Sequence, residues 1–145
     1  MGDIQELIKR GKAAFEQYDY LEAVNNYKAI ITQTENSAFS PALSREAVVA
    51  QLKVGWSFWY LGEWEMAEDN FDEAREKSEN LGFSAELGKS LISLGWMHLY
   101  RGSLKDAKEK AQSAQQAVSV AGDKNLVLRH RLLTGSVSSM IGHLE

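Results

Sequence analysis

Histidine and carboxylate side chains are the groups in this sequence best suited to chemistry, and their spacing builds no recognisable site. The three histidines are His98, His130 and His143. None has a carboxylate or a second histidine four residues further on, as a helical metal-binding pair requires. We therefore interpret His98, and more strongly the other two, as packing or hydrogen-bonded histidines, and expect no catalytic residue and no metal site.

Acids, glycines and cysteines also give no sign of catalysis or of a cofactor. Residues 63–80 carry eight acids and two bases, but their spacing around Ala67, Phe71 and Ala74 places most acids on the solvent side of one amphipathic helix. No glycine-rich turn leads into Lys-Ser or Lys-Thr, as a phosphate-binding loop would. The absence of cysteine excludes disulfides, thiolate zinc sites and cysteine nucleophiles. The sequence therefore predicts a protein that is not an enzyme and has no cofactor.

Composition points to one all-α domain. The 145 residues are 44% apolar and 25% charged, with a single proline and many residues that favour helices. The formal charge of −4 argues against a general nucleic-acid binder. No apolar run approaches the roughly 20 residues that span a bilayer, and the N-terminus lacks the basic and apolar regions of a secretory signal. We expect a cytoplasmic protein with no membrane partner.

An internal repeat organises the chain. Glycines lead similar segments at Gly11, Gly55, Gly95 and Gly135, spaced 44, 40 and 40 residues apart. The residues that follow the first three glycines also match: Ala23, Ala67 and Ala107 after twelve residues; Tyr27, Phe71 and Ala111 after sixteen; Ile30, Ala74 and Ala114 after nineteen. Small residues let antiparallel helices approach closely, and larger residues fill the groove beside them. The repeat therefore predicts helical hairpins that must stack to bury their second apolar faces.

Capping signals divide these hairpins into helices. Ser40-Pro41, Ser84, the capping-box-like Ser103-Leu-Lys-Asp106 and Asp123 are read as helix starts. They predict helices near residues 3–17, 20–35, 41–61, 64–80, 84–101, 104–121 and 123–143. The chain is thus expected to hold three hairpins and a terminal helix.

The second unit in particular resembles the tetratricopeptide repeat consensus, on the residues Gly55, Phe58, Gly62, Ala67, Phe71 and Ala74. The third unit matches well through Leu94-Gly95 and Ala107, and the first less well. The family's common period is about 34 residues, and its proline at the end of the second helix is missing here, so the chain is more similar to the longer-period branches. The resemblance implies a right-handed α-α superhelix in one domain: repeat 1 over about 3–36, repeat 2 over 41–80, repeat 3 over 84–121, and a half-repeat or capping helix over 123–143.

The resemblance also implies a concave groove lined by the first helix of each unit. Transferred to this sequence, the groove positions of the third unit are Lys89, Ile92, Trp96, Leu99 and Tyr100, and those of the last helix are Arg129, Leu132, Ser136, Ser139 and Met140. Exposed aromatics are typical anchors of peptide-binding surfaces. The candidate partner-binding residues are Lys12, Phe15, Lys53, Trp56, Trp59, Tyr60, Lys89, Trp96 and Tyr100. The alternative reading is that the tryptophans pack between helices.

A clamp for a peptide's terminal carboxylate, known in this family, fits poorly. Lys12 and Lys53 stand at its two asparagine places, and Ser93 stands at one of its two basic places. The lysines would instead favour an acidic or phosphorylated partner through charge steering.

The leading functional hypothesis is a scaffold or adaptor module that binds a peptide or partner protein in the aromatic groove. Two alternatives stay open at this point. The unfinished fourth unit, which is either an array end or a piece of a longer array, would pair with another copy of the chain. Or the chain would be the small-molecule or peptide sensor segment of a larger bacterial regulator.

Overall fold

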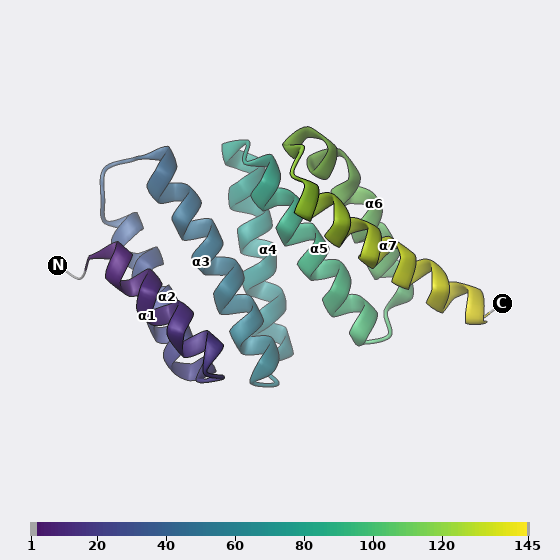
Figure 1. The fold of residues 1–145 in the computed structure, drawn as a ribbon, viewed down its shortest axis with the longest axis horizontal. Helices are drawn as coiled ribbons and strands as arrows, with labels where there is room; N and C mark the ends of the chain where they lie inside the picture. Colours follow the sequence, from purple (N-terminus) through teal and green to yellow (C-terminus); the bar gives the residue numbers. More distant parts are fainter. Residues whose placement is uncertain (1–2, 145) are drawn as a thin grey trace. The chain divides into compact units, whose positions relative to one another are not determined.

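The computed structural model describes residues 3–144, which form seven α-helices and no strand (Figure 1). The helices are α1 (Ile4–Glu16), α2 (Tyr20–Glu35), α3 (Pro41–Tyr60), α4 (Trp64–Leu81), α5 (Ser84–Tyr100), α6 (Leu104–Ala121) and α7 (Lys124–Leu144). Each end lies within one residue of the end predicted from the sequence. The all-α fold class is therefore confirmed.

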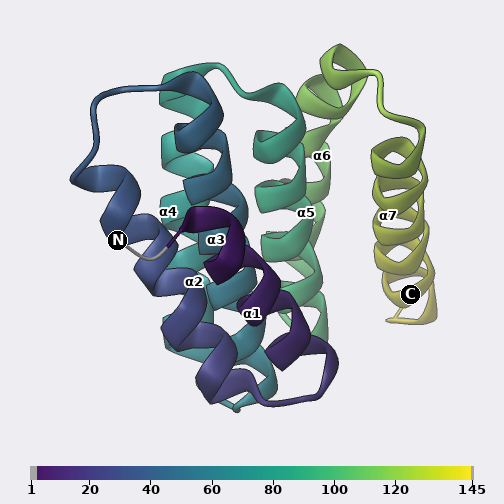
Figure 2. The same ribbon diagram turned by 60° about the vertical axis from the view of Figure 1, so that its left-hand side comes forward.

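The chain divides into two compact units, Met1–Ala74 and Arg75–Glu145, with the boundary inside α4. In the first unit, α2 packs against both α1 and α3. In the second unit, α5 packs along α6, and α7 contacts both of these helices (Figures 1 and 2). The single domain expected from the repeat stays a prediction.

Side-chain caps begin some helices, whereas α5 and α6 begin where predicted but without a side-chain cap bond. Ser40 accepts a hydrogen bond from the Leu43 amide at 3.4 Å, and Asp123 accepts one from the Asn125 amide at 2.8 Å, as the capping pattern predicted. Ser103 occupies the N-cap of α6 but makes no side-chain cap bond. Ser84 is the first helical residue of α5, and the N-cap is the buried Phe83. Asp19, which follows the same kind of turn, does cap α2 by accepting from the Glu22 amide at 3.2 Å.

The same tight turn ends four helices. In each turn, a backbone amide donates to the carbonyl oxygen of the residue five positions earlier. The residue directly before that amide has a left-handed backbone, which is the arrangement of a Schellman motif. Gly62, Gly82 and Gly102 take this conformation, with φ of 79°, 71° and 82°. The fourth turn uses Tyr18 at φ 63°, and it is the only non-glycine with positive φ within residues 3–144. The closing bonds are 2.8–2.9 Å long: Asp19 to Ala14, Glu63 to Phe58, Phe83 to Ser78 and Ser103 to His98.

A bulky side chain lies directly over the leading glycine of each of the first three units. A Cβ at Gly11 would lie 3.0 Å from the Tyr27 ring, and a Cβ at Gly55 would lie 2.5 Å from the Phe71 ring. These are the rings sixteen residues further on, as the repeat predicted. We call this arrangement the glycine contact.

The third unit departs from that register. Its residue sixteen positions after the glycine is Ala111, which is too small, and Leu133 of α7 covers Gly95 instead, 2.6 Å from a Cβ built there. The terminal helix thus completes the core of the second unit, where Leu126, Leu133 and Val137 are buried. Nothing lies within 4 Å of a Cβ at Gly135.

Gly55→Ala is expected to lower the free energy of unfolding by about 1–3 kcal/mol, because the added methyl group overlaps the Phe71 ring in a packed core. Gly135→Ala is the matched control, and should raise it by about 0.5–1 kcal/mol, because alanine favours the helix and meets open space. Urea unfolding followed by circular dichroism measures both. Equal effects at the two positions would contradict the glycine contact.

Tyr18→Gly is expected to raise the free energy of unfolding by up to about 1 kcal/mol. A left-handed backbone costs a non-glycine residue about 1–2 kcal/mol, and the extra chain entropy of glycine offsets part of this gain. Gly102→Ala, at the equivalent turn, should lower stability in the same assay. A loss of stability in Tyr18→Gly would show that the ring contact of Tyr18 with Tyr20, at 6.4 Å between centroids, outweighs the backbone strain.

Candidate functional site

The aromatic side chains of the first unit form one connected cluster. The Tyr20 ring of α2 stacks on the Tyr60 ring of α3, with centroids 4.9 Å apart and planes 20° apart. Phe15 of α1 meets both rings edge-on, at 5.4 Å and 6.0 Å. The rings of three helices therefore cover one another, and we call these three residues the tyrosine cluster.

The tryptophans extend this surface and also pack in the core. Trp56 contacts the ring of Phe71 at 5.0 Å between centroids, and Phe71 is the ring that lies over Gly55. Trp59 lies 6.5 Å from Trp56 and 5.8 Å from the exposed Trp64. Both Trp56 and Trp59 are half-buried. Trp56 therefore packs between helices, as one of the two readings predicted, and its role in binding a partner stays a prediction.

Two of the three predicted lysines lie in the first unit. The Lys53 ammonium lies 4.8 Å above the Phe15 ring, which is a cation–π contact with the tyrosine cluster. Lys12 is exposed on α1, one turn before Phe15. Lys89 is half-buried on α5 of the second unit. The structure therefore joins Lys53 directly to the candidate aromatic residues.

In the second unit the aromatic side chains face a hollow. Trp96 and Tyr100 of α5 stack with centroids 5.7 Å apart and planes 26° apart. Beside them is an open depression of about 670 Å³, which we call the α5–α7 hollow. It is lined by Trp96, Leu99, Tyr100, Arg131, Leu132, Gly135, Ser136, Ser139 and Met140. Seven of these nine residues are at positions that the family resemblance assigned to the groove.

The repeat register explains the hollow. The residues one, four and five places after the leading glycine are Trp56, Trp59 and Tyr60 in α3, and Trp96, Leu99 and Tyr100 in α5. In α7 they are Ser136, Ser139 and Met140. Two serines and a flexible methionine thus stand where α3 carries three rings and where α5 carries two rings and Leu99. The α5–α7 hollow therefore lies where α7 carries smaller or more flexible side chains than α3 does at the equivalent positions.

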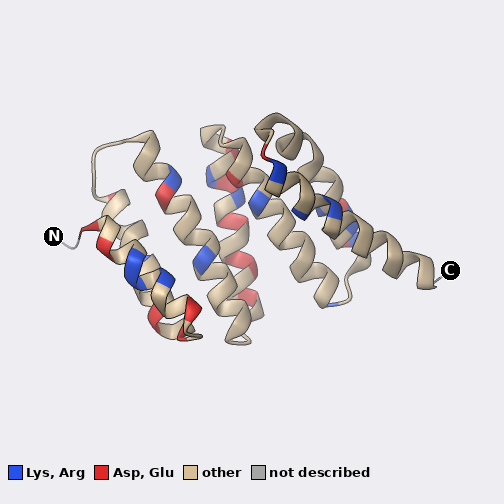
Figure 3. Ribbon diagram, viewed as in Figure 1, with Lys and Arg blue, Asp and Glu red and all other residues tan. Residues whose placement is uncertain are grey.

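Charge is distributed unevenly over the helices (Figure 3). Of the eight acids in residues 63–80, seven are exposed and Glu68 is half-buried, in keeping with a solvated helix face. By contrast α7 carries Lys124, Arg129 and Arg131 and no acidic residue.

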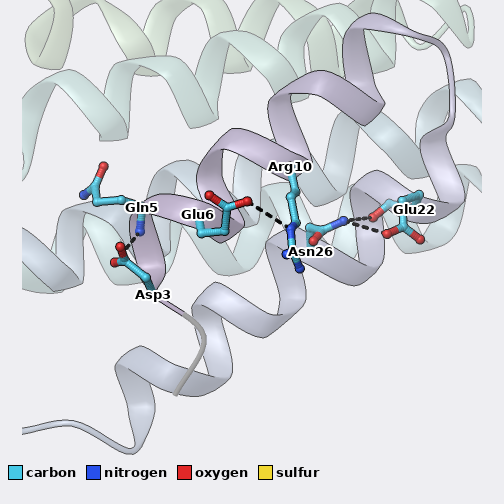
Figure 4. A network of polar contacts seen from close by, with 6 residues as sticks. All are labelled: Asp3, Gln5, Glu6, Arg10, Glu22 and Asn26. Carbon is cyan, nitrogen blue, oxygen red and sulfur yellow. Dashed lines mark hydrogen bonds and ion pairs between the residues drawn. The ribbon is translucent and has the colours of Figure 1, made fainter.

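Several polar contacts of α1 and α2 lie within single helices, whereas the Gln51 side-chain amide of α3 donates to Asn70 Oδ1 of α4. Figure 4 shows Asp3 capping α1 through the Gln5 amide at 3.1 Å, and the ion pair of Glu6 with Arg10 at 3.2 Å. In α2 the Asn26 side-chain amide donates to the Glu22 carbonyl oxygen at 2.9 Å. These contacts stabilise helix ends and exposed faces.

The histidines show no catalytic arrangement within residues 3–144. His130 is half-buried, and its Nε2 lies 2.8 Å from the Ala111 carbonyl oxygen. Since a carbonyl only accepts, this Nε2 carries the proton and ties α7 to α6. No cluster of three or more His, Asp or Glu side chains suited to a metal ion occurs in the part of the chain that the structure describes.

Burial raises the pKa of two tyrosines. For Tyr20 the main cause is desolvation, followed by the neighbouring Tyr60 and Tyr18. For the buried Tyr27, whose ring covers Gly11, it is desolvation and then Glu16. Tyr20 and Arg131 are not among the candidate site residues predicted from the sequence. The signal that could have identified Tyr20 is its aromatic side chain at the first residue of its helix, a position where α4 carries Trp64.

The chain matches no protein-family model and no curated protein sequence. None of the helices within residues 3–144 is long and apolar enough to cross a membrane.

Stability is expected to fall as the pH rises above about 10, because the unfolded chain then releases tyrosine protons that folded Tyr20 and Tyr27 retain. Below about pH 10 both states hold these protons, so the two groups add no pH dependence there. Tyr27→Phe should reduce the alkaline loss without changing the slope near neutral pH. Urea unfolding at a series of alkaline pH values measures it, and an unchanged alkaline slope in Tyr27→Phe would contradict the assignment.

Proposed function

We propose that this chain is a tetratricopeptide-like module with a right-handed superhelical stack, and that it is a non-enzymatic scaffold for a peptide or partner protein. The repeated turns at Gly62, Gly82 and Gly102 and the glycine contacts at Gly11 and Gly55 support the repeat assignment. One kind of turn recurs at the helix ends and the first two units share the glycine contact, which is the pattern of a repeat architecture.

One observation carries the binding role: aromatic side chains stay exposed at equivalent positions of two helices. Tyr60 of α3 is 55% exposed and Tyr100 of α5 is 65% exposed, and they are 40 residues apart in the repeat. Each stands beside a half-buried tryptophan, Trp56 or Trp96. Tyrosine and tryptophan provide large, rigid contact area at low cost in conformational entropy, which suits them to bind a partner.

The double variant Tyr60→Ala with Tyr100→Ala should lose capture of partner proteins at least tenfold, since aromatic anchors commonly contribute more than about 1 kcal/mol each. Affinity capture from a lysate of the native host, with quantitative mass spectrometry, measures this loss. Val120→Ala, which removes a 67% exposed apolar side chain from α6, is the matched control. Circular dichroism verifies that both variants are folded. Equal capture by the wild type and the double variant would contradict the proposal.

A further inference from the structure

We propose that the α5–α7 hollow is the seat for one bulky apolar side chain of a partner peptide whose flanking residues are acidic. This inference rests on the proposed function and adds the place and the chemistry of the partner.

The two aromatic surfaces differ in what lies against them. In the first unit, Tyr60 is stacked by Tyr20 and met by Phe15, so rings of the same unit occupy the space beside it. In the second unit, the stacked pair of Trp96 and Tyr100 lines an open volume of about 670 Å³. Pockets of some 300–1,000 Å³ hold ligands of drug size. The second unit therefore offers an open volume beside its stacked rings, whereas Tyr20 and Phe15 lie against Tyr60 in the first unit.

The walls of the hollow favour an apolar occupant. Trp96, Leu99 and Tyr100 form one side, and Leu132 and Met140 form the other. Leu132 is 56% exposed and Met140 is 47% exposed, so apolar surface from both helices would be covered by a side chain placed there. Methionine adapts its shape to different partners. Ser136 stands where α3 and α5 carry tryptophan and α1 carries Lys12, so a large ring is the side chain that two of the three earlier units place at this point.

The charge around the hollow favours acidic flanks. Arg131 is the only Asp, Glu, Lys or Arg residue among the lining residues, and α7 adds Lys124 and Arg129 without any acid. The single acid of α5, Glu86, is buried. Complementary charge at the rim of a binding site raises the association rate and selects against basic partners.

Synthetic peptides test both parts of the inference. The probe is a fluorescein-labelled Gly-Glu-Glu-Trp-Glu-Glu-Gly peptide, compared with versions that carry alanine in place of tryptophan or lysine in place of every glutamate. Fluorescence anisotropy with the full chain should show binding of the acidic tryptophan peptide, at least tenfold weaker binding of each altered peptide, and weakening by salt. No binding of the acidic tryptophan peptide, or equal binding of the lysine version, would overturn the inference.

Ser136→Trp places in the hollow the residue that α3 and α5 carry at the equivalent position, Trp56 and Trp96. It should weaken binding of the acidic tryptophan peptide at least tenfold. Ser138→Trp puts the same residue on α7 but beside α6, where Ser138 lines another depression, and should leave binding within twofold of the wild type. Arg131→Glu, an exposed position, tests the charge without filling the hollow. It should weaken the acidic peptide and strengthen the lysine version. Unchanged affinity in both Ser136→Trp and Arg131→Glu would overturn the assignment.

Other occupants give different results. If a second copy of the chain filled the hollow, light scattering would show a mass that rises with protein concentration and falls in Ser136→Trp, and this result would overturn the peptide inference. If host partners are captured through Tyr60 and Tyr100 while none of the synthetic peptides binds, the proposed function stands and the inference about the hollow fails. If the chain neither captures host partners through Tyr60 and Tyr100 nor binds any synthetic peptide, both proposals fail.

Discussion

Close approach of helices at glycine is the constraint on which the rest of this structure depends. Phe71 lies so near Gly55 that even one methyl group there would overlap its ring. The same ring supports Trp56, whose neighbour in the chain of ring contacts is Tyr60. The exposed aromatic surface of the first unit is thus built outward from a glycine in its core. Removing the space at the glycine would move the rings that carry the candidate site.

The second unit meets the same constraint in a different way. Ala111 leaves Gly95 uncovered by its own hairpin, and Leu133 of α7 fills the place. A helix that serves as the core cover cannot also present its buried face to a partner, so only its remaining faces are available. One of these lies beside Trp96 and Tyr100 and carries serine and methionine. The way the core is closed therefore determines where the hollow lies.

Helix positions were predictable from the sequence because their signals are local. Ser40-Pro41, Asp123 and the close spacing of Ala67, Phe71 and Ala74 each act within a few residues of chain, and every helix end was predicted within one residue. Contacts between distant residues were less predictable. Leu133 over Gly95 and Tyr20 against Tyr60 depend on which helix supplies the neighbouring side chain, and a repeat period does not state this. The hollow was harder still, because it is created by side chains that Ser136 and Ser139 lack. The missing cap bond at Ser103 shows that a local pattern can give the start of a helix correctly and still not determine which side chain bonds to it.

The turn at Gly62, Gly82 and Gly102 has a consequence for how such a chain grows. Each of these turns closes through backbone bonds around one left-handed residue, and α5 and α6 then begin without a side-chain cap bond. The glycines stand 20 residues apart, so a segment of 40 residues contains both of its turns and both residues that set its packing. A gene duplication of that length would copy a whole hairpin together with its turns. Single residues such as Ser136 could then differ between copies and give each copy its own surface.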